Sequence, residues 1–153
     1  MARERKAEKP LRDTQANRMR RARTVFKAGA PSALGVKPTS ITPDKVTASM
    51  RVGPMHLNRN NVVNGGIIMA FADVLGAAGA VLNRPLERRG GTLESKTNFF
   101  SPGRGPRLLA ESIPLHIGRT TSVWQTTVRN ADGRMVAIVT QTQMSLPRSA
   151  DES

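Results

Sequence analysis

The feature that most constrains this chain is an apolar stretch of 18 residues near its middle, residues 65–82 (GGIIMAFADVLGAAGAVL). About 18 apolar residues are enough to span a membrane, so a transmembrane helix is one interpretation. However, half of the positions are Gly or Ala, and Asp73 lies in the middle. We therefore expect a core helix that a sheet wraps closely, and no membrane segment. One broad apolar stripe at helical spacing supports this prediction, formed by Ile67, Ile68, Phe71, Leu75, Ala78 and Leu82.

Beyond the helix the apolar period changes to two, which is typical of strands. We predict strands at 92–100, 107–117, 121–129 and 135–146, and one before the helix at 45–52. Residues 29–44, punctuated by Pro31, Gly35, Pro38 and Pro43, are expected to be irregular. One strand, a long helix and four further strands predict an α+β fold. In it, an antiparallel sheet of about five strands curls round one long central helix.

The basic residues are concentrated at the N-terminus. Residues 1–28 hold ten of the 24 Lys and Arg and few large apolar side chains. Such a segment buries too little surface to offset its ordering entropy, so we expect residues 1–28 to form a disordered basic tail. The domain is expected at 29–147, which is an ordinary domain size, and residues 148–153 are expected to be a disordered C-terminal tail.

Composition restricts the possible functions. The chain has no Cys and 2 His, so neither a disulfide framework nor a thiolate metal site is possible, and we expect no metal. The start of the chain has no apolar leader pattern, and we expect a cytoplasmic protein. A net charge of +13 favours a polyanionic partner such as nucleic acid, a membrane surface or a phosphate-bearing small molecule. With 3% aromatic residues there are few stacking platforms, so we do not expect a nucleic-acid partner, although the basic tail leaves DNA association open.

Asp73 is the only charged residue in the apolar stretch. At helical spacing it lies opposite the large side chains, among Met69, Gly76, Ala77 and Ala80. It is either a solvent-facing residue on the outer side of an amphipathic helix, or a functional carboxylate that needs partners in apolar surroundings. The residues alone leave both interpretations open.

Two glycines, Gly65 and Gly66, open the predicted helix. They are either a simple helix boundary or a place where a substrate carbonyl reaches backbone N–H groups at the positive end of the helix dipole. By themselves they do not decide between these alternatives.

The spacing Asn58-x6-Gly65-Gly66-x6-Asp73, followed by a strand that begins at Thr92, resembles the PaaI-type hotdog thioesterases. The resemblance covers about residues 29–146. It implies a hotdog fold and an enzyme, an acyl-CoA thioesterase that hydrolyses an acyl- or aryl-CoA thioester to the free acid and coenzyme A without a cofactor. The alternative is a non-catalytic hotdog protein that binds acyl-CoA.

The resemblance also implies roles for single residues. Asp73 would be the general base or the nucleophile, and the Gly65 N–H would polarise the thioester carbonyl. Asn58 would position the attacking water or the thioester, and Thr92 would hydrogen-bond the carboxylate or that water. The expected substrate-binding residues are Asn64, Gly66, His56 and Arg119. Asn64 stands where the family usually has His. The alternative for His56 is a structural loop histidine, and the alternative for Arg119 is a solvated surface arginine. Weaker candidates for the phosphates of coenzyme A are Arg88, Arg89 and Arg104.

Helix geometry makes a prediction about assembly. Gly65 and Asp73 are eight residues apart, so about 12 Å of helix axis separates them. Both must lie within about 3 Å of one reacting group and its attacking oxygen. With the roles that the resemblance implies for Gly65 and Asp73, we therefore expect a homodimer whose active site is shared between the chains. We also expect a homotetramer, with the dimer as the alternative.

Overall fold

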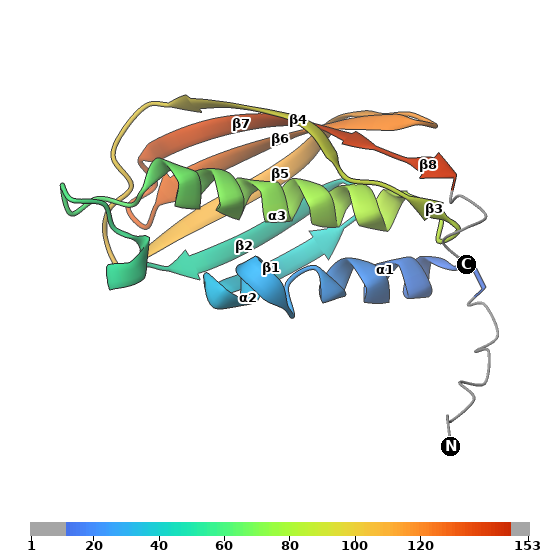
Figure 1. The fold of residues 1–153 in the computed structure, drawn as a ribbon, viewed down its shortest axis with the longest axis horizontal. Helices are drawn as coiled ribbons and strands as arrows, with labels where there is room; N and C mark the ends of the chain where they lie inside the picture. Colours follow the sequence, from blue (N-terminus) through green and yellow to red (C-terminus); the bar gives the residue numbers. More distant parts are fainter. Residues whose placement is uncertain (1–11, 148–153) are drawn as a thin grey trace, which may run out of the picture.

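A six-stranded antiparallel sheet wraps round one long helix in the computed structural model, which describes residues 12–147 (Figure 1). The strand order is β1-β2-β5-β6-β7-β4, and α3 lies across one face of the sheet. This confirms the predicted α+β hotdog fold. The bounds are β1 Val36–Thr42, β2 Lys45–Arg51, α3 Gly65–Asn83, β4 Thr92–Phe99, β5 Arg107–Ile117, β6 Thr121–Asn130 and β7 Met135–Met144.

Alternate side chains of the strands point at the helix and form the core. Trp124 and Val128 from β6 and Val139 from β7 are fully buried, as are Phe71 and Leu75 on α3. Burying each large apolar side chain contributes about 1.5–3 kcal/mol. The period of two in the strands and the helical period of α3 thus meet in one core, as the sequence predicts.

The small residues of α3 allow the sheet to approach closely. A Cβ at Gly79 would come within 2.5 Å of the Trp124 ring, so only glycine fits there. By length and composition α3 is apolar enough to cross a membrane, but 56% of its apolar window is buried within the protein. Packing against the sheet therefore accounts for the apolar sequence of α3.

The prediction that residues 29–44 are irregular is wrong in two places. It contains a short helix, α2 (Gly29–Ala33), and the edge strand β1, which pairs with β2. The register of β1 shifts after Pro38, and most of its side chains are exposed. An edge strand tolerates proline because one side needs no backbone donors, and exposure removes the alternation that would identify it.

The prediction of a disordered tail over residues 1–28 is also wrong for the part that the structure describes, residues 12–28. Residues Gln15–Thr24 form α1, which lies alongside α3 in Figure 1 and buries Ala22, with Phe26 buried in the turn that follows. Arg21 donates hydrogen bonds to the carbonyl oxygens of Leu86 (3.1 Å) and Arg88 (3.0 Å). The buried side chains of Ala22 and Phe26 and the hydrogen bonds from Arg21 to backbone carbonyls hold this segment against the domain. Residues 1–11 and the expected C-terminal tail 148–153 lie outside the described residues.

Three parts of the fold position the candidate site. A loop, residues 57–64, leads into the N-terminal end of α3. The other edge strand, β4, pairs with β7 beside the middle of α3. At the C-terminal end of α3, β3 (Arg88–Arg89) pairs with β8 (Leu146–Pro147), as Figure 1 shows.

Candidate active site

Asp73 lies in the middle of α3, half-buried, with its side chain toward β4 and β7. One carboxylate oxygen, Oδ1, accepts hydrogen bonds from the Thr92 hydroxyl (2.8 Å) and from Nε2 of Gln141 (2.7 Å). Within residues 12–147 no donor reaches the other oxygen, Oδ2. Asp73 therefore has polar partners in its apolar surroundings and keeps one oxygen available for chemistry.

A second amide extends this network. Gln143 donates from Nε2 to the Thr92 hydroxyl oxygen (2.9 Å), so this hydroxyl accepts one bond and donates one to Asp73. Gln141 is 0% exposed and Gln143 is 2% exposed. Thr92 was among the residues predicted from the sequence, whereas neither glutamine was. A signal existed: they continue the alternation that buries Val139, so a polar side chain at either position must point at the helix.

The start of α3 has one engaged and one unengaged backbone N–H. Asn64 is the N-cap, and its Oδ1 accepts from the Gly66 N–H at 2.8 Å. Its carbonyl oxygen accepts from Ile67 and Ile68. Among residues 12–147 nothing accepts from the Gly65 N–H. Gly65 thus offers an N–H donor at the positive end of the helix. The Gly66 N–H, which was expected to contact substrate, already donates to the Asn64 side chain.

An open apolar hollow of about 390 Å³ adjoins Gly65. Val63, Ile68 and Phe100 line it, and so does Phe99, whose ring would lie 3.2 Å from a Cβ at Gly65. No charged side chain contributes to this wall. The donor at Gly65 therefore borders a surface that suits an apolar group.

Two predicted residues of the preceding loop have local structural roles. Asn58 accepts through Oδ1 from the backbone N–H groups of Asn60 (2.9 Å) and Val62 (3.4 Å), which shapes the turn. His56 is 6% exposed, and its ring nitrogens contact the Gly53 N–H (3.0 Å) and the Leu34 carbonyl oxygen (3.1 Å). Both ring nitrogens of His56 are thus engaged inside the protein, which favours the structural alternative over a contact with substrate.

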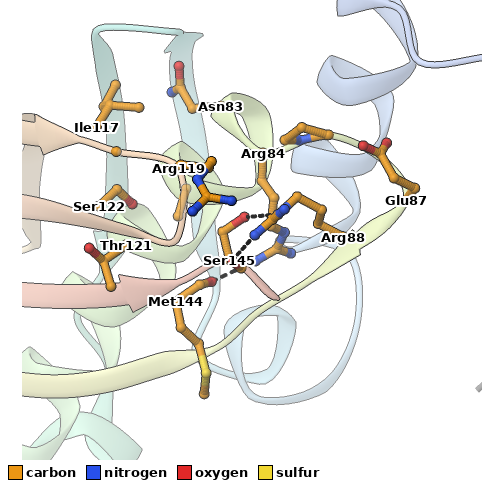
Figure 2. A pocket seen from close by; sticks show the side chains of 13 residues that line it. Asn83, Arg84, Glu87, Arg88, Ile117, Arg119, Thr121, Ser122, Met144 and Ser145 are labelled. Carbon is orange, nitrogen blue, oxygen red and sulfur yellow. Dashed lines mark hydrogen bonds between the residues drawn. The ribbon is translucent and has the colours of Figure 1, made fainter. Parts of the chain in front are cut away.

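Arg119 is exposed in the connection between β5 and β6, at the C-terminal end of α3. It lines a pocket of about 180 Å³ together with Arg84 and Arg88, and Figure 2 shows the three side chains around this pocket. Arg88 donates to Oγ (3.0 Å) and to the carbonyl oxygen (2.6 Å) of Ser145. Arg84, which is 7% exposed, was not among the residues predicted from the sequence. This pocket thus has three guanidinium groups and one carboxylate, Glu87. A second pocket, beside β1, is lined by Arg23, Lys27 and Lys37, and Arg104 lines a separate hollow near the loop that precedes α3.

The described residues contain no group of three or more His, Asp or Glu side chains that could hold a metal ion. The chemical groups that remain are the Asp73 carboxylate, the Gly65 N–H and the cationic pocket. The Asp73 carboxylate and the Gly65 N–H are eight residues apart on one helix, about 12 Å along its axis. A single chain therefore cannot bring them to one carbonyl.

Comparisons with known proteins identify the family. A sequence model of the thioesterase superfamily matches residues 60–137, just over half of the chain. A putative esterase of Deinococcus radiodurans is 30% identical over 107 residues, which cover 69% of this chain and 70% of that protein. Among solved structures, a thioesterase family protein from Silicibacter pomeroyi superposes with a TM-score of 0.80 at 24% identity, covering 88% of this chain and all of the other.

The E. coli PaaI protein superposes with a TM-score of 0.77 at 19% identity, covering 89% of this chain and 99% of that one. The family expected from the glycine and aspartate spacing is thereby confirmed. The family match includes Gly65, Asp73 and Thr92, and the relatives share the sheet and its central helix. By sequence match and by fold, this chain belongs to the thioesterase superfamily.

Proposed function

We propose that this protein is an acyl-CoA thioesterase, located in the cytoplasm, that hydrolyses an acyl- or aryl-CoA thioester to the free acid and coenzyme A. One observation carries the proposal: Asp73, in an apolar helix of a thioesterase-superfamily chain, has one carboxylate oxygen fixed by two donors and the other oxygen unengaged. A hydrolase needs such a group, because water or the carboxylate itself must attack the thioester carbon.

Two routes use the same atoms. As a general base, Oδ2 of Asp73 removes a proton from water while the water oxygen attacks the thioester carbon. As a nucleophile, Oδ2 attacks that carbon and expels coenzyme A as its thiolate, and water then hydrolyses the resulting anhydride to the free acid and the Asp73 carboxylate. In both routes negative charge develops on the carbonyl oxygen. The Gly65 N–H would stabilise this charge, a contribution that reaches about 10²–10³ in rate at comparable sites.

The remaining predicted roles concern Asn58 and Asn64. Because Oδ1 of Asn58 is used in its turn, only the side-chain NH₂ of Asn58 is left to position water or thioester. We assign Asn64 to capping α3, which keeps the Gly65 N–H exposed at the helix end. The family's usual His is thus replaced by a residue that still supports the helix start.

The site requires a second chain. The face of α3 that carries Asp73 also carries Gly66 and Met69, both exposed in the single chain. Beside it, β4 has one unpaired edge, with Leu93 64% exposed and Phe99 51% exposed. A two-fold partner that covers this face would place its α3 antiparallel to this one. The Gly65 end of each helix would then lie beside Asp73 of the other, giving two equivalent sites.

A homotetramer extends the same reasoning. On the outer face of the sheet, Leu109 and Ile113 of β5 are each 39% exposed, with Glu111 between them. Beyond Pro114 the register shifts, Leu115 is 54% exposed, and Ile117 pairs with the buried Ser122. Exposed apolar patches of this kind are typical of protein–protein contacts, so we propose that two dimers meet through this face.

The phosphates of coenzyme A would be held in the pocket that contains Arg119. The pocket is about eleven residues of α3 beyond Asp73, roughly 16 Å along the axis. The extended pantetheine arm of coenzyme A covers a distance of that order. The net charge of +13 would also attract a highly anionic substrate.

The alternative is a hotdog protein that binds acyl-CoA without hydrolysing it. Asn64 in place of the family's His is the observation that favours it. The two functions differ in turnover. We expect the purified protein to release free thiol continuously from at least one member of a panel of CoA esters with short, medium, long and aryl acyl groups. Binding of these esters with no thiol release from any of them would favour the alternative.

A further inference from the structure

Gln141 is a buried amide with one end unsatisfied. It is 0% exposed, it donates from Nε2 to Oδ1 of Asp73, and its own Oε1 has no hydrogen-bond donor among the described residues. A buried acceptor without a partner costs about 1–3 kcal/mol. An apolar side chain such as the neighbouring Val139 would avoid this cost, so stability alone does not explain a glutamine at this position.

Gly76 makes room for this amide. It lies almost one turn after Asp73 on α3 and is buried. A Cβ at Gly76 would overlap Oε1 of Gln141 and would lie 3.1 Å from its amide carbon. Gly76 is also inside a helix, where glycine is destabilising by roughly 0.5–1 kcal/mol relative to alanine. Gln141 on β7 and Gly76 on α3 therefore each lower the stability of the fold. A need for the amide beside Asp73 explains both residues.

The geometry shows what the amide does to the carboxylate. Gln141 and Thr92 both donate to Oδ1, and Gln143 occupies the Thr92 oxygen so that the hydroxyl proton is directed at Asp73. With both donors on one oxygen, the carboxylate plane is fixed and Oδ2 is the oxygen left to react. The ion pairs of the described chain, Arg18–Asp13 and Lys45–Glu111, involve none of these side chains.

We propose that Gln141 is a positioning residue for the reaction, held in place by the absence of a side chain at Gly76, and that it orients Asp73 so that Oδ2 faces the thioester carbon. This proposal rests on the proposed function. It assigns Gln141 no contact with the substrate. Its effect must therefore appear in the chemical step rather than in binding.

The first test replaces Gln141 with a side chain of similar length that cannot donate. In Gln141→Met we expect kcat to fall about tenfold to hundredfold, the loss for one hydrogen bond to a charged group, while KM stays within about twofold. Val139→Ala is the matched control, because Val139 lies on the same face of β7 without contacting Asp73. It should lower the melting temperature and leave kcat unchanged. An unchanged kcat in folded Gln141→Met would overturn the proposal.

A second variant reaches the amide from the helix. Gly76→Ala keeps Gln141 but displaces its amide, so it should also lower kcat with KM nearly unchanged. The double variant should then be no slower than Gln141→Met alone, because both changes remove the same contact. Losses that multiply would contradict the coupling of Gly76 to Gln141. If Gln141→Met fails to fold, Gly76→Ala decides, and an unchanged kcat there would overturn the proposal.

Different results would contradict the thioesterase function and the positioning role of Gln141. If the wild-type protein hydrolyses no thioester, the proposed function is wrong. If the wild type is active and Asp73→Asn is inactive, but Gln141→Met and Gly76→Ala retain full kcat, only the positioning role is wrong.

Discussion

Asp73 and its hydrogen-bond partners set what the chemistry can be at the scale of single residues. The sequence and the family resemblance together led to Asp73, Thr92 and Gly65, because their spacing along one helix and the strand after it is distinctive. They did not lead to Gln141 or Gln143, because the alternation of β7 places both on the buried face but does not identify the partner of a buried amide. The register of β4 on β7, with Thr92 opposite Gln143 and Ser95 opposite Gln141, sets which residues lie beside them.

The first prediction concerns the carboxylate. Asp73→Asn keeps an oxygen that can accept from Thr92 and Gln141, so we expect the fold and the oligomer to remain intact. It removes the negative charge that a base or nucleophile needs, so turnover should fall by at least about 10²-fold. Steady-state thiol release, with circular dichroism as the check of folding, measures this. A variant with more than about a tenth of wild-type kcat would rule out Asp73 as the catalytic group.

The second prediction concerns the cationic pocket. In Arg119→Ala we expect a higher KM for CoA esters and little change in kcat, because the phosphates bind equally in the ground state and the transition state. A thioester of N-acetylcysteamine lacks the nucleotide and should be hydrolysed as by the wild type. Arg134→Ala, an exposed turn arginine at the opposite end of β6, is the control. Equal losses on both substrates would mean that Arg119 is structural.

At the scale of secondary-structure elements, periodicity predicted the elements that bury one face and missed those that do not. The helix at 65–82 and the strands at 107–117 and 121–129 agree with α3, β5 and β6 within a residue at each end. The strand β1 has no alternation because most of it is exposed. The helix α1 is rich in arginine, and its composition does not reveal that Arg21 would bond to backbone carbonyls 65 and 67 residues away.

Because α1 and the turn that follows it pack onto the domain, we expect the loss of their buried side chains to destabilise the fold. The sharpest test is Phe26→Ala, since Phe26 is 6% exposed and belongs to the main core cluster. Its loss should lower the free energy of unfolding by about 3 kcal/mol. Arg23→Ala, at an exposed position three residues earlier, should change it by less than about 0.5 kcal/mol. Urea denaturation compares the two, and equal small effects would support the disordered tail originally expected.

At the scale of the whole molecule, the two groups of the proposed mechanism, the Asp73 carboxylate and the Gly65 N–H, are about 12 Å apart along one helix. The exposed face of α3 around Asp73 and the unpaired edge of β4 are adjacent, and both would be covered by a two-fold partner. The expectation of a second chain followed from the roles that the resemblance implies for Gly65 and Asp73 and from their separation along one helix. It does not contain the shape of the interface, because that depends on how two curved sheets meet.

The shared site is tested by mixing two inactive variants. Asp73→Asn removes the carboxylate, and Gly65→Pro removes the N–H. Proline suits the first position of a helix, and Asn64 before it already has an extended backbone (φ −59°, ψ 137°), as a residue before proline prefers. The one close contact is with the Phe99 ring, 3.2 Å from a Cβ at Gly65. Gly65→Pro homodimers that unfold like the wild type would establish that this variant is folded.

In a mixed dimer, one site collects both lesions and the other site neither. We therefore predict that heterodimers, purified with two different affinity tags after the subunits reassort, recover about half of the wild-type kcat per dimer, whereas each homodimer stays inactive. Verified, folded heterodimers that remain as inactive as the homodimers would contradict a site formed by Asp73 of one chain and Gly65 of its partner.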